Sequence, residues 1–225
     1  MTIGKSDEAR AEILARIRKA LERAARASEA EIEAAESYIR RHPRGAIKPI
    51  DEDLVTRFRT RAQAMQSTTE TVAAWADIPQ AAARYLHAHS LPRTGVVWPA
   101  LGHLDWRGAG LAMEARGANG EDLVGITGVF AALAETGTLM VTSGPESPAA
   151  TSLLPETHIA VVPVERIVAH MEDAWDLARE ELGELPRAVN FISGPSRTGD
   201  IDQTIVLGAH GPYRVHMILV SEPAL

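Results

Sequence analysis

From residue 95 onward, short apolar runs alternate with segments of helical periodicity, and this alternation limits the fold more than any other feature of the sequence. Four runs rich in Val, Ile and Phe are typical of buried strands: 95–98, 124–127, 159–162 and 188–192. Strands connected by helices lie parallel in one sheet that is covered on both sides. The sequence therefore predicts an α/β protein with a mostly parallel sheet and helices on both faces.

The remaining elements are predicted from the spacing of apolar residues and from the Gly and Pro residues that end helices and strands. Amphipathic helices are predicted over 51–66, 78–89 and 164–182, the last ending at Gly183. The first of them should turn five side chains inward: Leu54, Val55, Phe58, Ala62 and Met65. A first strand is predicted over 70–75, and a short apolar helical turn should follow the strand at 124–127. The runs 204–207 and 213–220 predict two last strands, which we expect to pair antiparallel at the edge of the sheet.

An N-terminal helical arm over residues 1–45 should precede the α/β domain at 46–225. Residues 7–40 are dominated by Ala, Glu and Arg, and Ile13, Ile17 and Leu21 fall at helical spacing. The stripe fits a helix that docks on another subunit, including a second copy of this chain. It fits equally a helix packed on its own domain, because it is too short to specify a coiled coil.

Composition excludes several classes of function. The net charge of −7 gives no support to binding of nucleic acid or anionic membranes. There is no cysteine, so these 225 residues hold no disulfide, thiolate nucleophile or Cys-ligated cluster. No apolar run is long enough to span a membrane, and we expect a cytoplasmic protein. The histidines form no ligand pattern, so no metal site is predicted.

A loop over 193–202 carries the chemistry of an anion site. It combines glycine, hydroxyls, one guanidinium and two carboxylates between two predicted strands. Backbone N–H groups, hydroxyls and Arg197 could surround an anion while an aspartate holds the arginine. The candidate ligand-binding residues are Gly194, Ser196, Arg197, Thr198, Asp200 and Asp202. The alternative is a tight turn with an internal Arg–Asp pair and no ligand.

Two further segments carry candidate site residues. Glu135 interrupts an apolar run and needs a partner, because an unpaired buried carboxylate is costly. It could act chemically or brace backbone N–H groups of a neighbouring loop. Thr136, Gly137 and Thr138 follow it as candidate ligand-binding residues. In the turn at 208–212, His210 could serve as a general base and Gly211 could approach the ligand.

Together the segments 135–138, 194–201 and 208–212 resemble the lactate utilization (LUD) domain family, and the resemblance covers most of residues 50–225. It implies a fold similar to the group of ribose-5-phosphate isomerase and CoA-transferases. It also implies a part in oxidising L-lactate to pyruvate within a set of three proteins. The iron–sulfur clusters of that set belong to Cys-rich partners, so no cofactor is expected within this cysteine-free chain.

Three functions remain open at this point. The first is a subunit of a lactate-oxidising complex that is not an enzyme alone and that binds a small anion, its iron–sulfur partners, or both. The second is a stand-alone enzyme that handles acyl groups or phosphosugars, with Glu135 as nucleophile or base. The third is a structural adaptor, in which the loops serve only folding.

Overall fold

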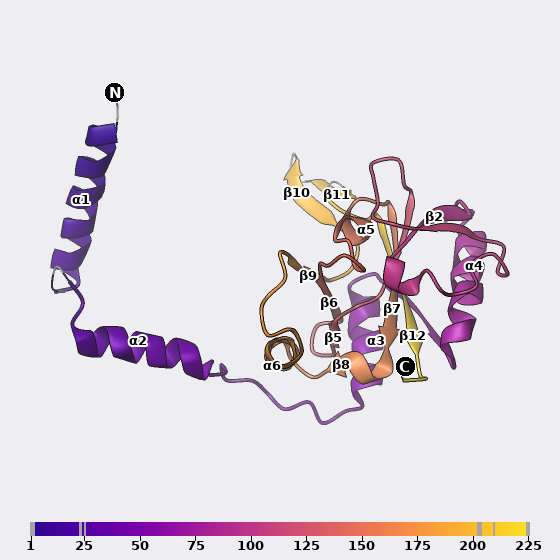
Figure 1. Cartoon of the computed structure of the whole chain (residues 1–225), viewed down its shortest axis with the longest axis horizontal. Coiled ribbons are helices and arrows are strands. Elements are labelled where there is room, and N and C mark those ends of the chain that lie inside the picture. Colours follow the sequence, from indigo (N-terminus) through magenta and orange to yellow (C-terminus); the bar gives the residue numbers. More distant parts are fainter. Residues whose placement is uncertain (1–2, 23, 25, 202–203, 209, 224–225) are drawn as a thin grey trace. The chain divides into compact units, whose positions relative to one another are not determined.

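The computed structural model describes residues 3–22, 24, 26–201, 204–208 and 210–223; the side chains of residues 3–6, 198–201 and 204–207 lie outside that description. Two compact units divide the chain, Met1–Ile47 and Lys48–Leu225. The first unit holds helices α1 (Ile3–Ala20) and α2 (Glu29–Arg41), so the predicted helical arm contains two helices (Figure 1). A capping box explains the second start, because Ser28 and Glu31 satisfy each other's backbone N–H groups.

The second unit is built around six parallel strands. Their order is β1 (Thr68–Val72), β12 (Arg214–Val220), β7 (Thr157–Pro163), β4 (Val124–Thr127), β2 (Thr94–Val97) and β3 (Ala112–Ala115). Strands β4 and β7 are buried along their whole length, as expected for a parallel sheet covered on both faces.

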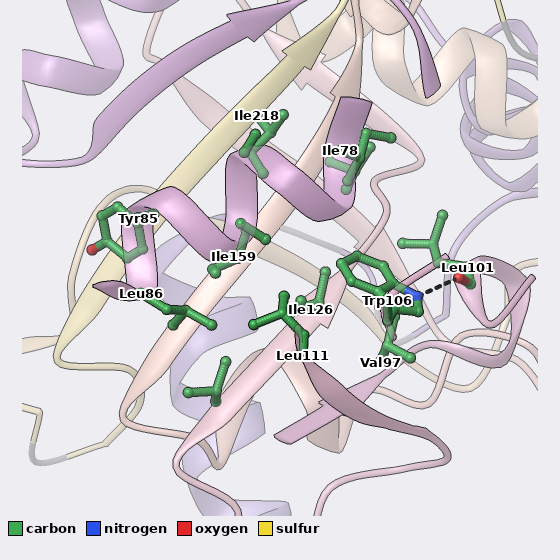
Figure 2. Close-up of a cluster of buried hydrophobic side chains, with 14 of the residues drawn as sticks. Ile78, Tyr85, Leu86, Val97, Leu101, Trp106, Leu111, Ile126, Ile159 and Ile218 are labelled. Atoms are coloured by element: carbon green, nitrogen blue, oxygen red, sulfur yellow. Dashed lines mark hydrogen bonds between the residues drawn. The ribbon is translucent and has the colours of Figure 1, made fainter. Parts of the chain in front are cut away.

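One face of this sheet packs against α4 (Ile78–Ala88), whose Pro79 occupies the first turn. Figure 2 shows the resulting core, in which Ile78 and Leu86 of the helix meet Ile126, Ile159 and Ile218 of the strands. The connection from β2 to β3 closes one end of the core, where the Nε1 of Trp106 donates to the carbonyl of Leu101 (2.9 Å).

The other face packs against α3 (Leu54–Ala64) and a smaller sheet, and α6 (Met171–Leu182) covers the far side of that sheet (Figure 1). The smaller sheet has the order β8 (Ile167–Val168), β5 (Ala131–Leu133), β6 (Thr138–Thr142), β9 (Val189–Ile192), with β6 antiparallel to both neighbours. The short elements are α5 (Ala150–Leu153) and three 3₁₀ turns, η1 (Trp75–Asp77), η2 (Pro99–Leu101) and η3 (Val164–Arg166).

The predicted α/β architecture with a parallel sheet is confirmed, but several local predictions were wrong. The helical turn predicted after β4 is strand β5, whose three residues are fully buried between β6 and β8. The helix predicted over 164–182 begins only at Met171, since Ile167 joins β8. The first strand covers 68–72 instead of 70–75, and Met65 is 40% exposed because α3 ends before it.

The largest correction concerns the last strands. Strand β12 is not an antiparallel edge strand: it lies between β1 and β7 and is parallel to both. Its residues after Arg214 are buried, which suits a central position better than an edge. The segment predicted as a loop over 193–202 contains strand β10 (Arg197–Ile201), which forms an antiparallel ribbon with β11 (Thr204–Leu207).

No helix within the described part of the chain has the length and apolar character needed to cross a membrane.

Candidate functional site

Glu135 lies in the turn between β5 and β6 and contacts the start of α6. Its Oε2 accepts a hydrogen bond from Nδ1 of His170 (2.8 Å), and its Oε1 accepts one from the backbone N–H of Met171 (3.1 Å). The first N–H groups of a helix have no partner within the helix, and its N-terminus favours negative charge. Glu135 therefore braces backbone N–H groups of a neighbouring segment, which was one of the two roles expected of it.

His170 is the residue that the sequence did not single out. It caps α6, with its backbone N–H donating to Asp173 (2.9 Å), and its side chain is only 9% exposed. Because an ionised carboxylate only accepts, Nδ1 carries the proton in the neutral ring and Nε2 is then an acceptor. The pair is a carboxylate-oriented imidazole, an arrangement that can serve a general base. Asp173, three residues after the cap, is the sequence signal that could have located it.

The backbones of Gly137 and Gly194 pack against the last turn of α3 and against Met65, the residue that caps it. Gly137 has a φ of +70°, and a Cβ there would lie 2.2 Å from the backbone nitrogen of Ala62. Gly194 has a φ of +75°, and its Cβ would lie 2.1 Å from the carbonyl oxygen of Met65. Both positions need glycine for conformation and for space. Because β6 pairs with β9, the ends of the two strands that carry these glycines lie side by side.

The other candidate residues of the segments 135–138 and 194–202 lie beside these two glycines in the sequence. Arg197 is exposed and donates from Nη2 to the carbonyl of Met65 (3.2 Å), so it contacts the end of α3. Thr136 is exposed and donates its hydroxyl to the buried Thr138 (2.8 Å). The side chains of Thr198 and Asp200, and all of Asp202, lie outside the described residues, so the pairing of Arg197 with an aspartate stays a prediction.

The turn that carries His210 is attached to Ser196 by backbone hydrogen bonds. The N–H of Ser196 donates to the carbonyl of Pro212, and that of Gly208 donates to the carbonyl of Ser196 (both 2.9 Å). A Cβ on Gly211 would lie 3.4 Å from the Cβ of Ser196. Ser196, Gly211 and the exposed His210 thus belong to one surface.

The structure therefore brings the three motif segments to one region, but it divides their contacts into two sets. Gly137, Gly194 and Arg197 surround the end of α3, whereas Glu135 is joined to α6. Among the hydrogen bonds and ion pairs of the described residues, none connects Glu135 with Arg197.

Parallel sheets commonly bind ligands at the carboxyl ends of two strands between which the strand order reverses. In this protein Trp98 occupies that position. Here that place is between β2 and β4. The indole is buried beside Gly128, and its Nε1 donates to the carbonyl of Pro148 (3.1 Å). The loop over 143–148 is held there as well, since its Glu146 carbonyl accepts from Ala100 (3.3 Å).

His158 lies inside the six-stranded sheet and not on the surface. It is fully buried in β7, with Nε2 2.7 Å from the hydroxyl of Thr127 on β4. Burial lowers the pKa of His158 to about 4. The imidazole is therefore neutral at physiological pH and belongs to the core.

Comparison with known proteins assigns the family. The chain matches the LUD domain over residues 5–220 and belongs to the LUD domain family. Its relatives include proteins named lactate utilization protein C. That of Bacillus subtilis strain 168 is 38% identical over 133 residues, which are 56% of this chain and 54% of the relative. That of Shouchella clausii is 42% identical over 101 residues, 44% of each chain. This chain thus matches about half the length of these relatives.

A crystal structure of a DUF162 family protein from Deinococcus radiodurans has the same fold. It superposes with a TM-score of 0.58 at 23% identity, over 75% of this chain and 96% of that one.

Replacing Glu135 with glutamine should lower the free energy of unfolding by about 1–2 kcal/mol, because the charged acceptor at the start of α6 is lost. Urea unfolding at neutral pH measures the change. Glu184→Gln is the matched control, since Glu184 is an exposed carboxylate beyond the end of α6. Equal stability of the two variants would show that the brace contributes nothing.

Proposed function

We propose that this protein is a component of a system that oxidises L-lactate to pyruvate, and that it binds a small anionic ligand, iron–sulfur partner proteins, or both. The observation that carries the proposal is the similarity to proteins named lactate utilization protein C. Oxidation of lactate releases two electrons and two protons, so an electron acceptor is needed. The 225 residues contain no cysteine, and we therefore place the iron–sulfur clusters in the partners. The same proposal includes a cytoplasmic location.

Arg197 is the residue through which we propose that an anion is bound. Arg197 is exposed and donates one hydrogen bond among the described residues. A guanidinium carries five N–H donors in a planar fork, which suits it to pair with a carboxylate as well. Ser196 lies beside it and adds a hydroxyl.

Complementation of a deletion strain tests both the role in lactate oxidation and the role of Arg197. We expect deletion of the gene to abolish growth on L-lactate but not on pyruvate, and Arg197→Ala to restore growth poorly. Arg59→Ala is the control, because Arg59 is exposed on α3, the helix whose end Arg197 contacts. Full growth with a folded Arg197→Ala protein would support the structural adaptor instead, and growth on lactate after deletion would contradict the pathway.

The arm offers a surface for the proposed partners. Ile13, Ile17 and Leu21 are 57%, 48% and 63% exposed, and Arg16, Arg18 and Lys19 lie among them. An apolar stripe among cationic side chains suits a partner with an acidic, partly apolar surface.

Ile17→Asp should therefore abolish co-purification with iron–sulfur lactate utilization proteins while leaving the α/β unit folded. Leu185→Asp, at a 61% exposed leucine outside the arm, should have no effect. If light scattering shows that the isolated chain is a dimer and that Ile17→Asp makes it monomeric, the stripe instead binds a second copy.

A second candidate function rests on the pair formed by Glu135 and His170. A carboxylate hydrogen-bonded to an imidazole could act in a stand-alone enzyme of the CoA-transferase-like group, with Glu135 as nucleophile or base. Purified protein should then turn over a thioester or sugar phosphate without partners, and Glu135→Gln should abolish that turnover in folded protein. Absence of both turnover and thermal shift with these substrates would remove the support for this function.

A further inference from the structure

A cavity of about 510 Å³ lies on the outer edge of the six-stranded sheet, apart from the motif segments. Its walls come from the amino ends of β2 and β3, from the edge strand β3, and from the segment that crosses from β3 to β4. The volume is in the range of sites that hold small organic ligands.

One wall is held rigid by ion pairs. Arg116 binds both carboxylate oxygens of Asp122 (2.8 and 2.9 Å), and its Nε donates to Glu114 (2.7 Å). The side chain of Asp122 is only 10% exposed, and Arg116 lowers the pKa of that carboxyl. The crossing segment is thus fixed to β3, and these three charged groups already satisfy one another.

Two charged side chains in the lining remain available. Arg107 and Glu121 are exposed, and neither side chain has a hydrogen bond or ion pair among the described residues. Apolar surface is available beside them, since Met113 packs at the margin of the core and Leu123 is 47% exposed. The cavity therefore offers one free cation, one free anion and a non-polar wall.

We propose that this cavity binds a small zwitterion, an amino acid or a short peptide. Its carboxylate pairs with Arg107, its ammonium group pairs with Glu121, and its side chain lies on Met113 and Leu123. A simple monoanion such as lactate fits less well, because the lining carries three carboxylates against two guanidinium groups. The inference does not depend on the proposed role in lactate oxidation.

Calorimetric titration of the full chain tests it, first with the amino acids and dialanine. L-alanine and L-lactate form a decisive pair, since they differ only in an ammonium group against a hydroxyl. We expect at least one zwitterion to bind and L-lactate to bind at this cavity at least tenfold more weakly than the corresponding zwitterion. Arg107→Gln and Glu121→Gln should each weaken zwitterion binding about tenfold or more, the usual effect of losing a charged hydrogen bond.

Arg93→Gln is the matched control, because Arg93 is an exposed arginine near the cavity that does not line it. It should leave the affinity unchanged. Equal binding of L-lactate and L-alanine, or binding that Glu121→Gln does not alter, would replace the zwitterion site with a general anion site. The proposal is also overturned if no amino acid or dialanine binds. The growth phenotype of Arg197→Ala is independent of all these outcomes, so the two proposals can fail separately.

Discussion

Replacing Gly137 with alanine should destabilise the protein by about 3 kcal/mol or more, since two effects add. Its φ of +70° is unfavourable for any residue with a Cβ. The new methyl group would also lie 2.2 Å from the backbone nitrogen of Ala62 and 2.5 Å from the carbonyl carbon of Arg61. Backbone atoms of a packed helix cannot rotate aside, so α3 and β6 would have to separate. Thermal and urea unfolding measure the loss.

Gly183 separates the two effects, because it has nearly the same φ (+67°), but a Cβ there would meet no described atom within 4 Å other than those of its chain neighbours. Gly183→Ala should cost only about 1 kcal/mol, the strain of a positive φ without a steric clash. If both variants lost the same stability, the close approach to α3 would have no energetic weight. Gly194→Ala should resemble Gly137→Ala, since its Cβ would lie 2.1 Å from the carbonyl oxygen of Met65.

The second large effect is a loss of stability in mild acid, which two buried histidines should cause. Burial lowers the pKa of both His158 and His216 to about 4, and the charge of nearby His89 adds to the effect on His216. In the unfolded chain each ring takes up a proton near pH 6.5. Between these values the unfolded state binds more protons, so stability is intact above about pH 6.5 and falls as the pH approaches 4.

At pH 5 the loss relative to pH 7.5 should be about 2 kcal/mol for each histidine, or about 4 kcal/mol together. Urea unfolding across this range measures it. His158→Gln should remove about half of the pH dependence, whatever its stability at neutral pH. His87→Gln, at an exposed position on α4, should leave the dependence unchanged. A pH profile that His158→Gln does not flatten would contradict the assignment.

Prediction from the sequence succeeded where local pattern and tertiary environment agree. Helix α4 has Pro79 in its first turn and apolar residues at helical spacing, and β7 contains the uninterrupted apolar run 159–162 after the polar residues 156–158. Strand β5 shows the opposite case. Ala131, Ala132 and Leu133 favour a helix by intrinsic propensity, but pairing with β6 and β8 outweighs that preference. Similarly, Ile167 continues the apolar stripe of α6 and nonetheless joins β8.

The candidate site was predicted in part. The sequence correctly marked Glu135 as a carboxylate in need of a partner, but the partner, His170, is 35 residues away and nothing local connects them. The sequence predicts Gly137 and Gly194 as ligand-binding residues. The structure shows close approach to α3, which depends on tertiary packing that no pattern around either glycine encodes.

The central position of β12 has a consequence for how the chain folds. Strand β1 pairs with no strand other than β12 among those described, and paired residues such as Thr68 and His216 are 148 positions apart in sequence. During synthesis, residues 68–72 therefore cannot join the sheet until residues 214–220 have left the ribosome. Until then, the edges of β1 and β7 that pair with β12 in the folded protein have no partner strand. Such open edges favour aggregation. We expect slow formation of the sheet, as is usual where pairing is distant in sequence, and a need for protection of the nascent chain until β12 is inserted.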